Sequence, residues 1–181
     1  MSKKSVATTA LTGCFGCHMS LLDVDERIID LVNVVEFHRS PFTDIKTFEK
    51  DCDIGLIEGG CANSEEFEIL LEFRKHCNIL VAMGSCALRG GLPALRNGIP
   101  LEECLNTAYL DGPTYVEGDK TIPHHHDIPQ IFDRVYNVQE IVKIDYFLPG
   151  CPPKADLIWK FLVAAVQGKE AELPYEVIRY D

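Results

Sequence analysis

Short apolar segments alternate along the chain with longer segments in which apolar residues recur every three or four positions. A short run of apolar, often β-branched residues that ends at a turn is typical of a buried strand. This pattern predicts five strands, at residues 6–11, 34–37, 53–58, 78–83 and 141–148.

Three longer segments between and after these strands have the periodicity of helices. The first, residues 20–32, carries acidic residues in its early turns, where carboxylates suit the positive end of the helix dipole. The second, residues 63–76, begins with Asn63 three positions before Glu66, a spacing typical of a capping box. The third is the final helix, residues 154–166.

The remaining stretches are less regular. Residues 92–109 predict short helical pieces, residues 111–127 a surface excursion, and residues 128–135 a short helix. Alternation of helices with nearly continuous apolar strands favours a parallel sheet that is covered on both faces. We therefore predict a flavodoxin-like α/β fold, a three-layer sandwich. With 181 residues, the chain fits a single domain over residues 1–181.

The charge of the chain argues against two classes of partner. Seventeen Lys and Arg against 28 Asp and Glu give a net charge of −11, which repels phosphate backbones and anionic lipids. No apolar run is long enough to span a membrane, and the first residues lack the apolar core of a signal peptide. We therefore expect a cytoplasmic protein that neither binds nucleic acid nor inserts into a membrane.

Cysteine is the unusual part of the composition, with eight residues in the chain. In a reducing cytoplasm this number indicates metal or redox chemistry more than disulfides. Cys14 and Cys17 follow the first predicted strand, Cys61 the third, Cys86 the fourth and Cys151 the fifth. Ligands of open α/β sheets bind beyond the carboxyl ends of the strands. Four separate stretches of sequence therefore bring cysteine to one edge of one sheet.

Four of these cysteines form a set suited to an iron–sulfur cluster. A [4Fe–4S] cluster needs four thiolates, which Cys14, Cys17, Cys86 and Cys151 supply. Glycines beside these cysteines allow the backbone to approach closely. Pro152 after the last one resembles the Cys-Pro ending of iron–sulfur motifs. The sequence thus predicts one [4Fe–4S] cluster.

Other interpretations of the cysteines stay open. A Cys-x-x-Cys that opens a helix after a strand also places the redox dithiol of thioredoxin-like proteins, although the last two cysteines of the set would then lack a role. A structural zinc is chemically allowed, but such sites usually use two C-x2-C knuckles and the chain has one. Buried cysteines also act as small hydrophobic residues, which we expect of Cys52, Cys77 and Cys104. Cys61 is the reserve ligand.

Three polar sites are further candidates. Glu58, at the end of an apolar strand, is a candidate proton relay or a group that offers an oxygen to iron, and a capping or surface carboxylate is the alternative. His18, next to Cys17, is a candidate for a hydrogen bond that tunes the cluster, or else faces solvent or a partner. The run His124-His125-His126 has the composition of a metal site but also of an ordinary polar loop, which we favour.

Five motifs together resemble a known family. They are GCFGCHMS at residues 13–20, LDVDE at 22–26, EG at 58–59, GSC at 84–86 and PGCP at 149–152. This combination is similar to the small subunit of [NiFe] hydrogenases, and most of all to the cytoplasmic bidirectional, NAD-reducing type. The resemblance covers essentially the whole chain. It implies that Cys14, Cys17, Cys86 and Cys151 bind the proximal [4Fe–4S] cluster.

The resemblance also implies partners. It predicts a large subunit that carries the Ni–Fe site, and a diaphorase module of iron–sulfur and flavin subunits that holds FMN and reduces NAD. Small subunits of uptake hydrogenases carry further clusters and an export signal, whereas only 30 residues, none of them cysteine, follow Cys151 here. We therefore expect one cluster in this chain, an electron-transfer subunit of a hydrogen:NAD⁺ oxidoreductase with no hydrogenase activity of its own.

Two related classes fit the sequence less well. The 20 kDa-type iron–sulfur subunit of NADH:quinone oxidoreductase shares the fold and the last two cysteine contexts, but its first motif has adjacent cysteines, which Phe15-Gly16 separates here. This subunit is the alternative function. A free FMN carrier would need a phosphate-binding loop rich in Ser and Thr after the first strand, where this chain has two cysteines.

Overall fold

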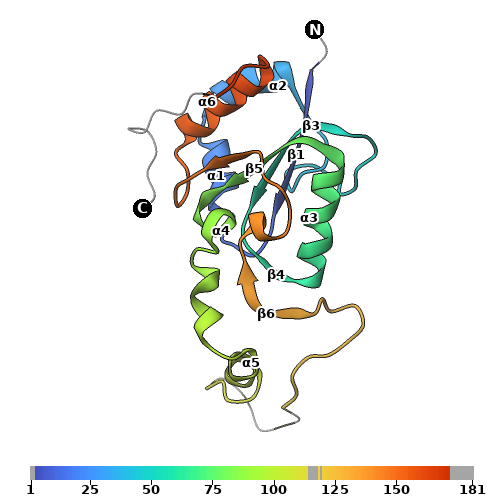
Figure 1. The fold of residues 1–181 in the computed structure, drawn as a ribbon, viewed down its shortest axis with the longest axis vertical. Coiled ribbons are helices and arrows are strands. Elements are labelled where there is room, and N and C mark those ends of the chain that lie inside the picture. Colours follow the sequence, from blue (N-terminus) through green and yellow to red (C-terminus); the bar gives the residue numbers. More distant parts are fainter. Residues whose placement is uncertain (1–2, 114–117, 119, 172–181) are drawn as a thin grey trace.

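The computed structural model describes residues 3–113, 118 and 120–171. Its main element is a five-stranded parallel sheet with the order β2-β1-β3-β5-β7 (Figure 1). The strands are β1 (Lys4–Ala10), β2 (Val35–Phe37), β3 (Cys52–Glu58), β5 (Cys77–Met83) and β7 (Tyr146–Leu148). Counted within the sheet alone, this is the order 2-1-3-4-5 of flavodoxin-like folds. The predicted fold class is confirmed.

Helices cover both faces of this sheet. The first face carries α1 (Gly16–Leu22), α2 (Arg27–Val34) and α6 (Ala155–Val166), and the second carries α3 (Ser64–His76), α4 (Gly84–Arg89) and the 3-10 helix η2 (Val138–Glu140). Successive strand residues point to opposite faces, so Leu56 packs against the first group and Ile57 against the second. The three central strands β1, β3 and β5 therefore contribute to both hydrophobic cores, which explains why β3 and β5 are apolar over most of their length.

A small antiparallel sheet extends the molecule beyond the carboxyl ends of the main strands (Figure 1). It pairs β4 (Cys61–Asn63) with β6 (Ile131–Tyr136), next to the 3-10 helix η1 (Pro93–Gly98) and the helix α5 (Leu101–Tyr109). The predicted short helix at 128–135 was therefore wrong. Ile131–Tyr136 is rich in β-branched and aromatic residues, and its backbone pairs with Cys61 and Asn63, which lie far away in the sequence.

Two other predictions need smaller corrections. The helix at 20–32 is interrupted after Leu22, and Asp25 adopts a left-handed conformation with φ 56° before α2 begins. The fifth strand is restricted to β7, because residues 141–145 are turn and irregular backbone: the N–H groups of Ile141 and Val142 donate to the Val138 carbonyl. The excursion at 111–127 lies partly outside the described residues, and its described part forms no helix or strand. That one domain spans the whole chain stays a prediction.

The start of α3 has the predicted cap with one difference. The Asn63 side chain accepts a hydrogen bond from the Glu66 backbone N–H at 3.0 Å, as in a capping box. The Glu66 carboxylate, however, accepts from the Ala62 N–H and from the Thr12 hydroxyl, both at 2.7 Å. The cap thus ties the loop after β1 to the start of α3. None of the helices among the described residues is long and apolar enough to cross a membrane.

Candidate metal centre

Four loops meet at the carboxyl edge of the sheet and enclose a cavity of about 80 Å³. The residues that line it come from all four loops: Gly13, Cys14, Gly16, Cys17, Glu58, Gly59, Ser85, Cys86, Gly150, Cys151 and Pro152. A cavity needs roughly 10–15 Å³ to admit one water molecule, so this one has room for a group of several atoms. All four cysteines of the predicted set line this cavity.

Backbone hydrogen bonds connect the four loops in pairs. The Ser85 N–H and hydroxyl both donate to the Gly150 carbonyl, at 2.8 and 3.1 Å, and so join the loops that carry Cys86 and Cys151. Thr12 and Gly60 exchange two backbone hydrogen bonds of 3.1 and 2.8 Å, which join the loops after β1 and β3. The positions of the cysteines are therefore fixed by the backbone of the loops.

Glycines lie where a side chain would collide with a cysteine sulfur. A Cβ atom on Gly84 would lie 2.3 Å from the Cys17 Sγ, and one on Gly91 would lie 2.8 Å from the Cys86 Sγ. Both glycines have positive φ angles, of 80° and 52°, which other residues adopt only at a cost. Gly91 was not among the predicted site residues, although the Gly90-Gly91 pair that follows the Cys86 helix is a visible signal in the sequence.

The spacing of the sulfur atoms discriminates between metal sites. Four thiolates around one zinc ion at about 2.3 Å would lie roughly 3.8 Å from one another. Among the described residues, only His125, His126 and Asp127 have three ligand atoms that all lie within 4.8 Å of one another. No three of the four cavity sulfur atoms therefore lie within 4.8 Å of one another. The distances between them are thus larger than those among the ligands of a single zinc ion. The donor set and the cavity fit a larger cluster.

The electrostatics of the cavity require a positive group. Burial raises the pKa of Cys17 well above its usual range, and Glu58 and the other three cysteines raise it further. Burial also raises the pKa of Cys86, and Cys151, Cys14 and Glu58 add to the effect. Several anions in one pocket disfavour each other, so the thiols lose their protons only when a metal compensates the charge.

Glu58 is part of the cavity wall and not a surface carboxylate. It is 2% exposed, and its Oε2 atom accepts from the His18 backbone N–H at 2.6 Å and from the His18 Nδ1 at 2.7 Å. His18 is fully buried. Its Nδ1 atom thus bonds to a carboxylate and not to sulfur, and its Nε2 atom has no partner among the described residues.

The remaining cysteines do not line the cavity. Cys52 and Cys77 are opposite each other on β3 and β5 and belong to the core, as predicted, and burial raises the pKa of Cys77 to about 12. Cys61 is also buried in this core, and its pKa is raised to about 11 by burial. The reserve ligand thus lies outside the site. Cys104 is partly buried on α5.

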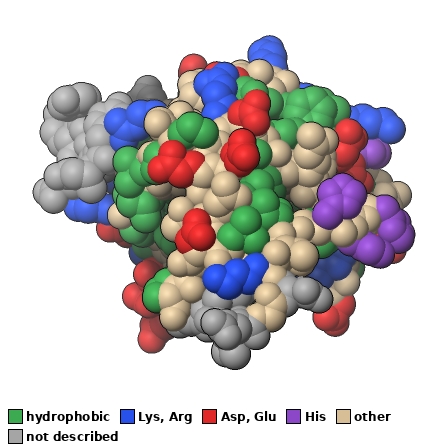
Figure 2. All heavy atoms as spheres, turned by 90° about the horizontal axis from the view of Figure 1, so that it is seen from below, with side chains coloured by type: hydrophobic (Ala, Val, Ile, Leu, Met, Phe, Trp, Pro, Cys, Tyr) green, Lys and Arg blue, Asp and Glu red, His purple; other side chains and the backbone are tan. Residues whose placement is uncertain are grey.

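The predicted histidine loop lies on the surface. His125 and His126 are exposed, and both contact the carboxylate of Asp127, at 3.2 and 3.1 Å. These ion pairs account for the close approach of the three side chains. Histidine side chains gather at one edge of the face that Figure 2 shows, and acidic side chains are scattered over the same face.

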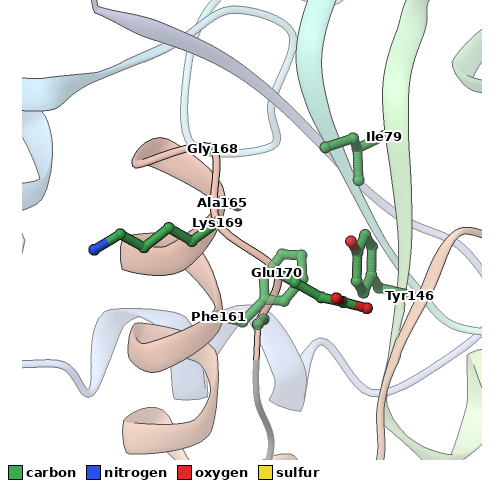
Figure 3. A pocket seen from close by; sticks show the side chains of 8 residues that line it. Ile79, Tyr146, Phe161, Ala165, Gly168, Lys169 and Glu170 are labelled. Atoms are coloured by element: carbon green, nitrogen blue, oxygen red, sulfur yellow. The ribbon is translucent and has the colours of Figure 1, made fainter.

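A second cavity, of about 320 Å³, lies away from the cysteines (Figure 3). Tyr146, Phe161 and Ile79 contribute to its wall, and Lys169 and Glu170 lie on the segment after α6 that borders it. Ile79 and Tyr146 lie near the amino ends of β5 and β7. This cavity is therefore near the opposite edge of the sheet from the four cysteines.

A flavodoxin-like sheet with four cysteines around one cavity at its carboxyl edge is the architecture of a metal-cluster protein of the α/β class. Comparison with known proteins gives the family. Residues 14–165 match the family described as "NADH ubiquinone oxidoreductase, 20 Kd subunit", and the chain belongs to it.

Relatives that match most of the chain are hydrogenase subunits. The chain is 47% identical over 180 residues to the NAD-reducing hydrogenase HoxS subunit delta of Cupriavidus necator, with 99% of this chain and 86% of that one covered. It is 36% identical over 174 residues to a protein of the F420-non-reducing hydrogenase of Methanothermobacter thermautotrophicus, with 95% of this chain covered but only 56% of that relative. The predicted resemblance to hydrogenase small subunits is confirmed.

Solved structures give the same relationship. One chain of a crystal structure of an NAD⁺-reducing [NiFe]-hydrogenase in the H2-reduced state superposes with a TM-score of 0.96 and 45% identity, over 99% of both chains. A chain of the [NiFeSe]-hydrogenase of Dm. baculatum superposes with a TM-score of 0.57 over 92% of this chain and 63% of that one. Its identity is 21%, so this second likeness concerns the fold alone.

Proposed function

We propose that this chain is the electron-transfer subunit of a hydrogen:NAD⁺ oxidoreductase and that it holds one [4Fe–4S] cluster on Cys14, Cys17, Cys86 and Cys151. The observation that carries the proposal is the convergence of these four cysteines on one cavity, where no three of the sulfur atoms lie within 4.8 Å of one another, as ligands of a single zinc ion would. The cluster would supply one-electron transfer when bound.

The residues of this chain would hold and shield that cluster. The four thiolates bind it, and the glycines beside them let the loop backbones close around it. Two further groups act at the wall of the cavity: Glu58, which is a candidate proton acceptor or oxygen donor to iron, and the Ser85–Gly150 hydrogen bonds that keep two loops together. In this proposal no bond of H2 is broken in this chain.

The catalytic cofactors belong to partner subunits in this proposal. Two of the proteins named above, one relative and one solved structure, are NAD-reducing hydrogenases, which supports a large subunit with a Ni–Fe site that splits H2. Iron–sulfur and flavin subunits of a diaphorase, with FMN, would pair the electrons again for hydride transfer to NAD⁺. We also propose a cytoplasmic location, without nucleic-acid partners and without insertion into a membrane.

A second candidate function is the 20 kDa-type iron–sulfur subunit of an NADH:quinone oxidoreductase-like complex. The description of the matching family favours it. Against it stand the 47% identity to a hydrogenase subunit and the two residues that separate the first pair of cysteines. Both functions would use four cysteines at this edge of the sheet, and the partners of the chain distinguish the two functions most directly.

Replacement of one proposed ligand tests the electron-transfer role. In the assembled complex, Cys86→Ala should abolish H2-driven NAD⁺ reduction, because the intact [4Fe–4S] cluster needs four thiolates and would not assemble on three. Cys104→Ser is the matched control, since Cys104 lies on α5 outside the cavity, and it should keep the activity. NAD⁺ reduction at the wild-type rate in Cys86→Ala would refute the assignment of the ligands.

A further inference from the structure

A buried histidine–glutamate pair forms one wall of the cysteine cavity. Glu58 is at the end of β3 and His18 is in the first turn of α1, 40 positions apart in the sequence. The Oε2 atom of Glu58 accepts two hydrogen bonds from His18, one from the backbone at 2.6 Å and one from Nδ1 at 2.7 Å. Both side chains are almost completely buried. Such short hydrogen bonds to a carboxylate are among the stronger ones in proteins.

Aromatic contacts fix the orientation of the imidazole. The ring of Phe15 stacks on His18 with a centroid distance of 4.7 Å and an angle of 5°, and Phe42 contacts it edge-on at 5.3 Å. A carboxylate only accepts hydrogen bonds, so Nδ1 carries the proton that it donates to Glu58. The second ring nitrogen, Nε2, is buried without a partner among the described residues. The hydrogen bond to Glu58 is therefore the one polar contact of the ring that the described structure contains.

This arrangement leaves one oxygen of Glu58 for the cavity. Oε2 is occupied twice by His18, whereas no described residue donates a hydrogen bond to Oε1. A Cβ built on Gly13 would lie 3.9 Å from Oε1, so this oxygen is beside the loop that carries Cys14. Glu58 also lines the cavity together with the four cysteines.

We propose that His18 is a positioning residue that holds the Glu58 carboxylate against the wall of the cluster cavity, with Oε2 bound and Oε1 directed to the loop of Cys14. The inference rests on the proposed function, because it assumes a cluster in this cavity. A carboxylate at a fixed place beside a cluster disfavours the uptake of an electron, so its position affects the reduction potential. His18 would thus act on the cluster only through Glu58.

A double-mutant cycle on the cluster potential tests this dependence. The assembled complex is prepared with His18→Leu, with Glu58→Gln and with both, and the midpoint potential of the cluster is followed by electron paramagnetic resonance. Glu58→Gln should raise the potential because it removes a negative charge. His18→Leu should change the potential when Glu58 is present and should cause no further change in the Glu58→Gln background. The same change in both backgrounds would overturn the inference.

Two further variants separate positioning from a general structural effect. His18→Asn keeps an amide donor near the place of Nδ1 and should keep the wild-type potential, whereas His18→Gln, with a longer side chain, should not. Thr8→Val removes another buried hydrogen bond, between the hydroxyls of Thr8 and Ser40, neither of which lines the cavity, and should leave the potential unchanged. If the His18→Leu complex does not assemble, the midpoint potentials of His18→Asn and His18→Gln test the positioning role instead. A potential in His18→Asn that deviates as far as in His18→Gln contradicts the positioning role.

Iron analysis keeps this inference apart from the proposed function. If the wild-type chain holds no cluster, the proposed function fails, and the inference fails with it. A second outcome is that the wild-type chain and the variants hold the same amount of iron. If the effects of the two substitutions on the midpoint potential are then additive, only the positioning role of His18 is wrong.

Discussion

At the scale of single residues, the fit between glycine and sulfur gives a testable consequence. Gly84 has a φ of 80°, and a Cβ there would lie 2.3 Å from the Cys17 Sγ. Gly84→Ala should therefore displace the sulfur and also introduce backbone strain of about 1–3 kcal/mol. We expect the complex to lose the iron of this cluster and to unfold at a lower temperature. Gly98→Ala is the control, because its Cβ would contact nothing within 4 Å. A full complement of iron in Gly84→Ala would disprove the tight fit.

The candidate ligands were visible in the sequence, whereas their surroundings were not. Cys14, Cys86 and Cys151 each follow an apolar strand, and the common edge of a parallel sheet then predicts that they meet. The sequence also singles out Glu58 and His18, but not their hydrogen bond, because nothing local relates two residues that lie 40 positions apart. Contacts of this kind depend on how α1 packs against the end of β3.

At the scale of elements, Asp145 connects one helix and two strands. Its carboxylate accepts from the Arg74 guanidinium of α3 at 2.7 Å and from the Leu80 N–H of β5 at 2.8 Å, and β7 starts at the next residue. Partial burial raises the pKa of Asp145, but the hydrogen bonds from Arg74 and Leu80 outweigh it and lower the pKa below 3.8. The ionised form is thus the one that stabilises the fold.

Asp145→Asn should lower the free energy of unfolding at pH 7 by about 1–3 kcal/mol, since it weakens charged hydrogen bonds in a partly buried place. A lowered pKa contributes stability above the unfolded value near 3.8, and this contribution disappears as the pH falls through the folded value. Urea unfolding at several pH values should therefore show that the difference in the free energy of unfolding between the wild type and Asp145→Asn becomes smaller below about pH 4. Lys143→Gln is the control with little expected effect, because Lys143 is 85% exposed and 4.0 Å from Asp145. A difference in unfolding free energy that increases as the pH falls below about 4 would contradict this role of Asp145.

Elements with a local signal were predictable, and those that depend on distant pairing were not. The strands β3 and β5 are apolar over most of their length because both faces are buried, and Asn63 with Glu66 marks the start of α3. β4 has only three residues and is too short for a periodicity to show. β6 was misread as a helix because its partner lies in the loop after β3. Tertiary pairing determined its structure, not local propensity.

At the scale of the whole molecule, topology accounts for the position of the site. The sheet adds β2 on one side of β1 and then β3, β5 and β7 on the other side, so the strand order reverses between β1 and β3. Ligands of open α/β sheets bind at such a reversal. The loops after β1 and β3 leave there and contribute Cys14, Cys17 and Glu58, while the loops after β5 and β7 complete the cavity. The small sheet β4–β6 and α5 extend past this edge (Figure 1). In the proposed complex, partner subunits determine what lies against the cavity.

The identity of those partners is best tested by the metals that copurify with this chain. We would tag the chain, purify it anaerobically from its native host with everything it holds, and measure nickel and iron for each copy. A [NiFe] hydrogenase should give nickel in a one-to-one ratio with the chain, together with abundant iron. When the subunits are then separated, nickel should stay with a partner and iron should remain with this chain, because the four-cysteine cavity suits iron–sulfur ligation. Iron without nickel would instead assign the chain to a quinone-reducing complex, with the cysteine site unchanged and the hydrogenase function wrong.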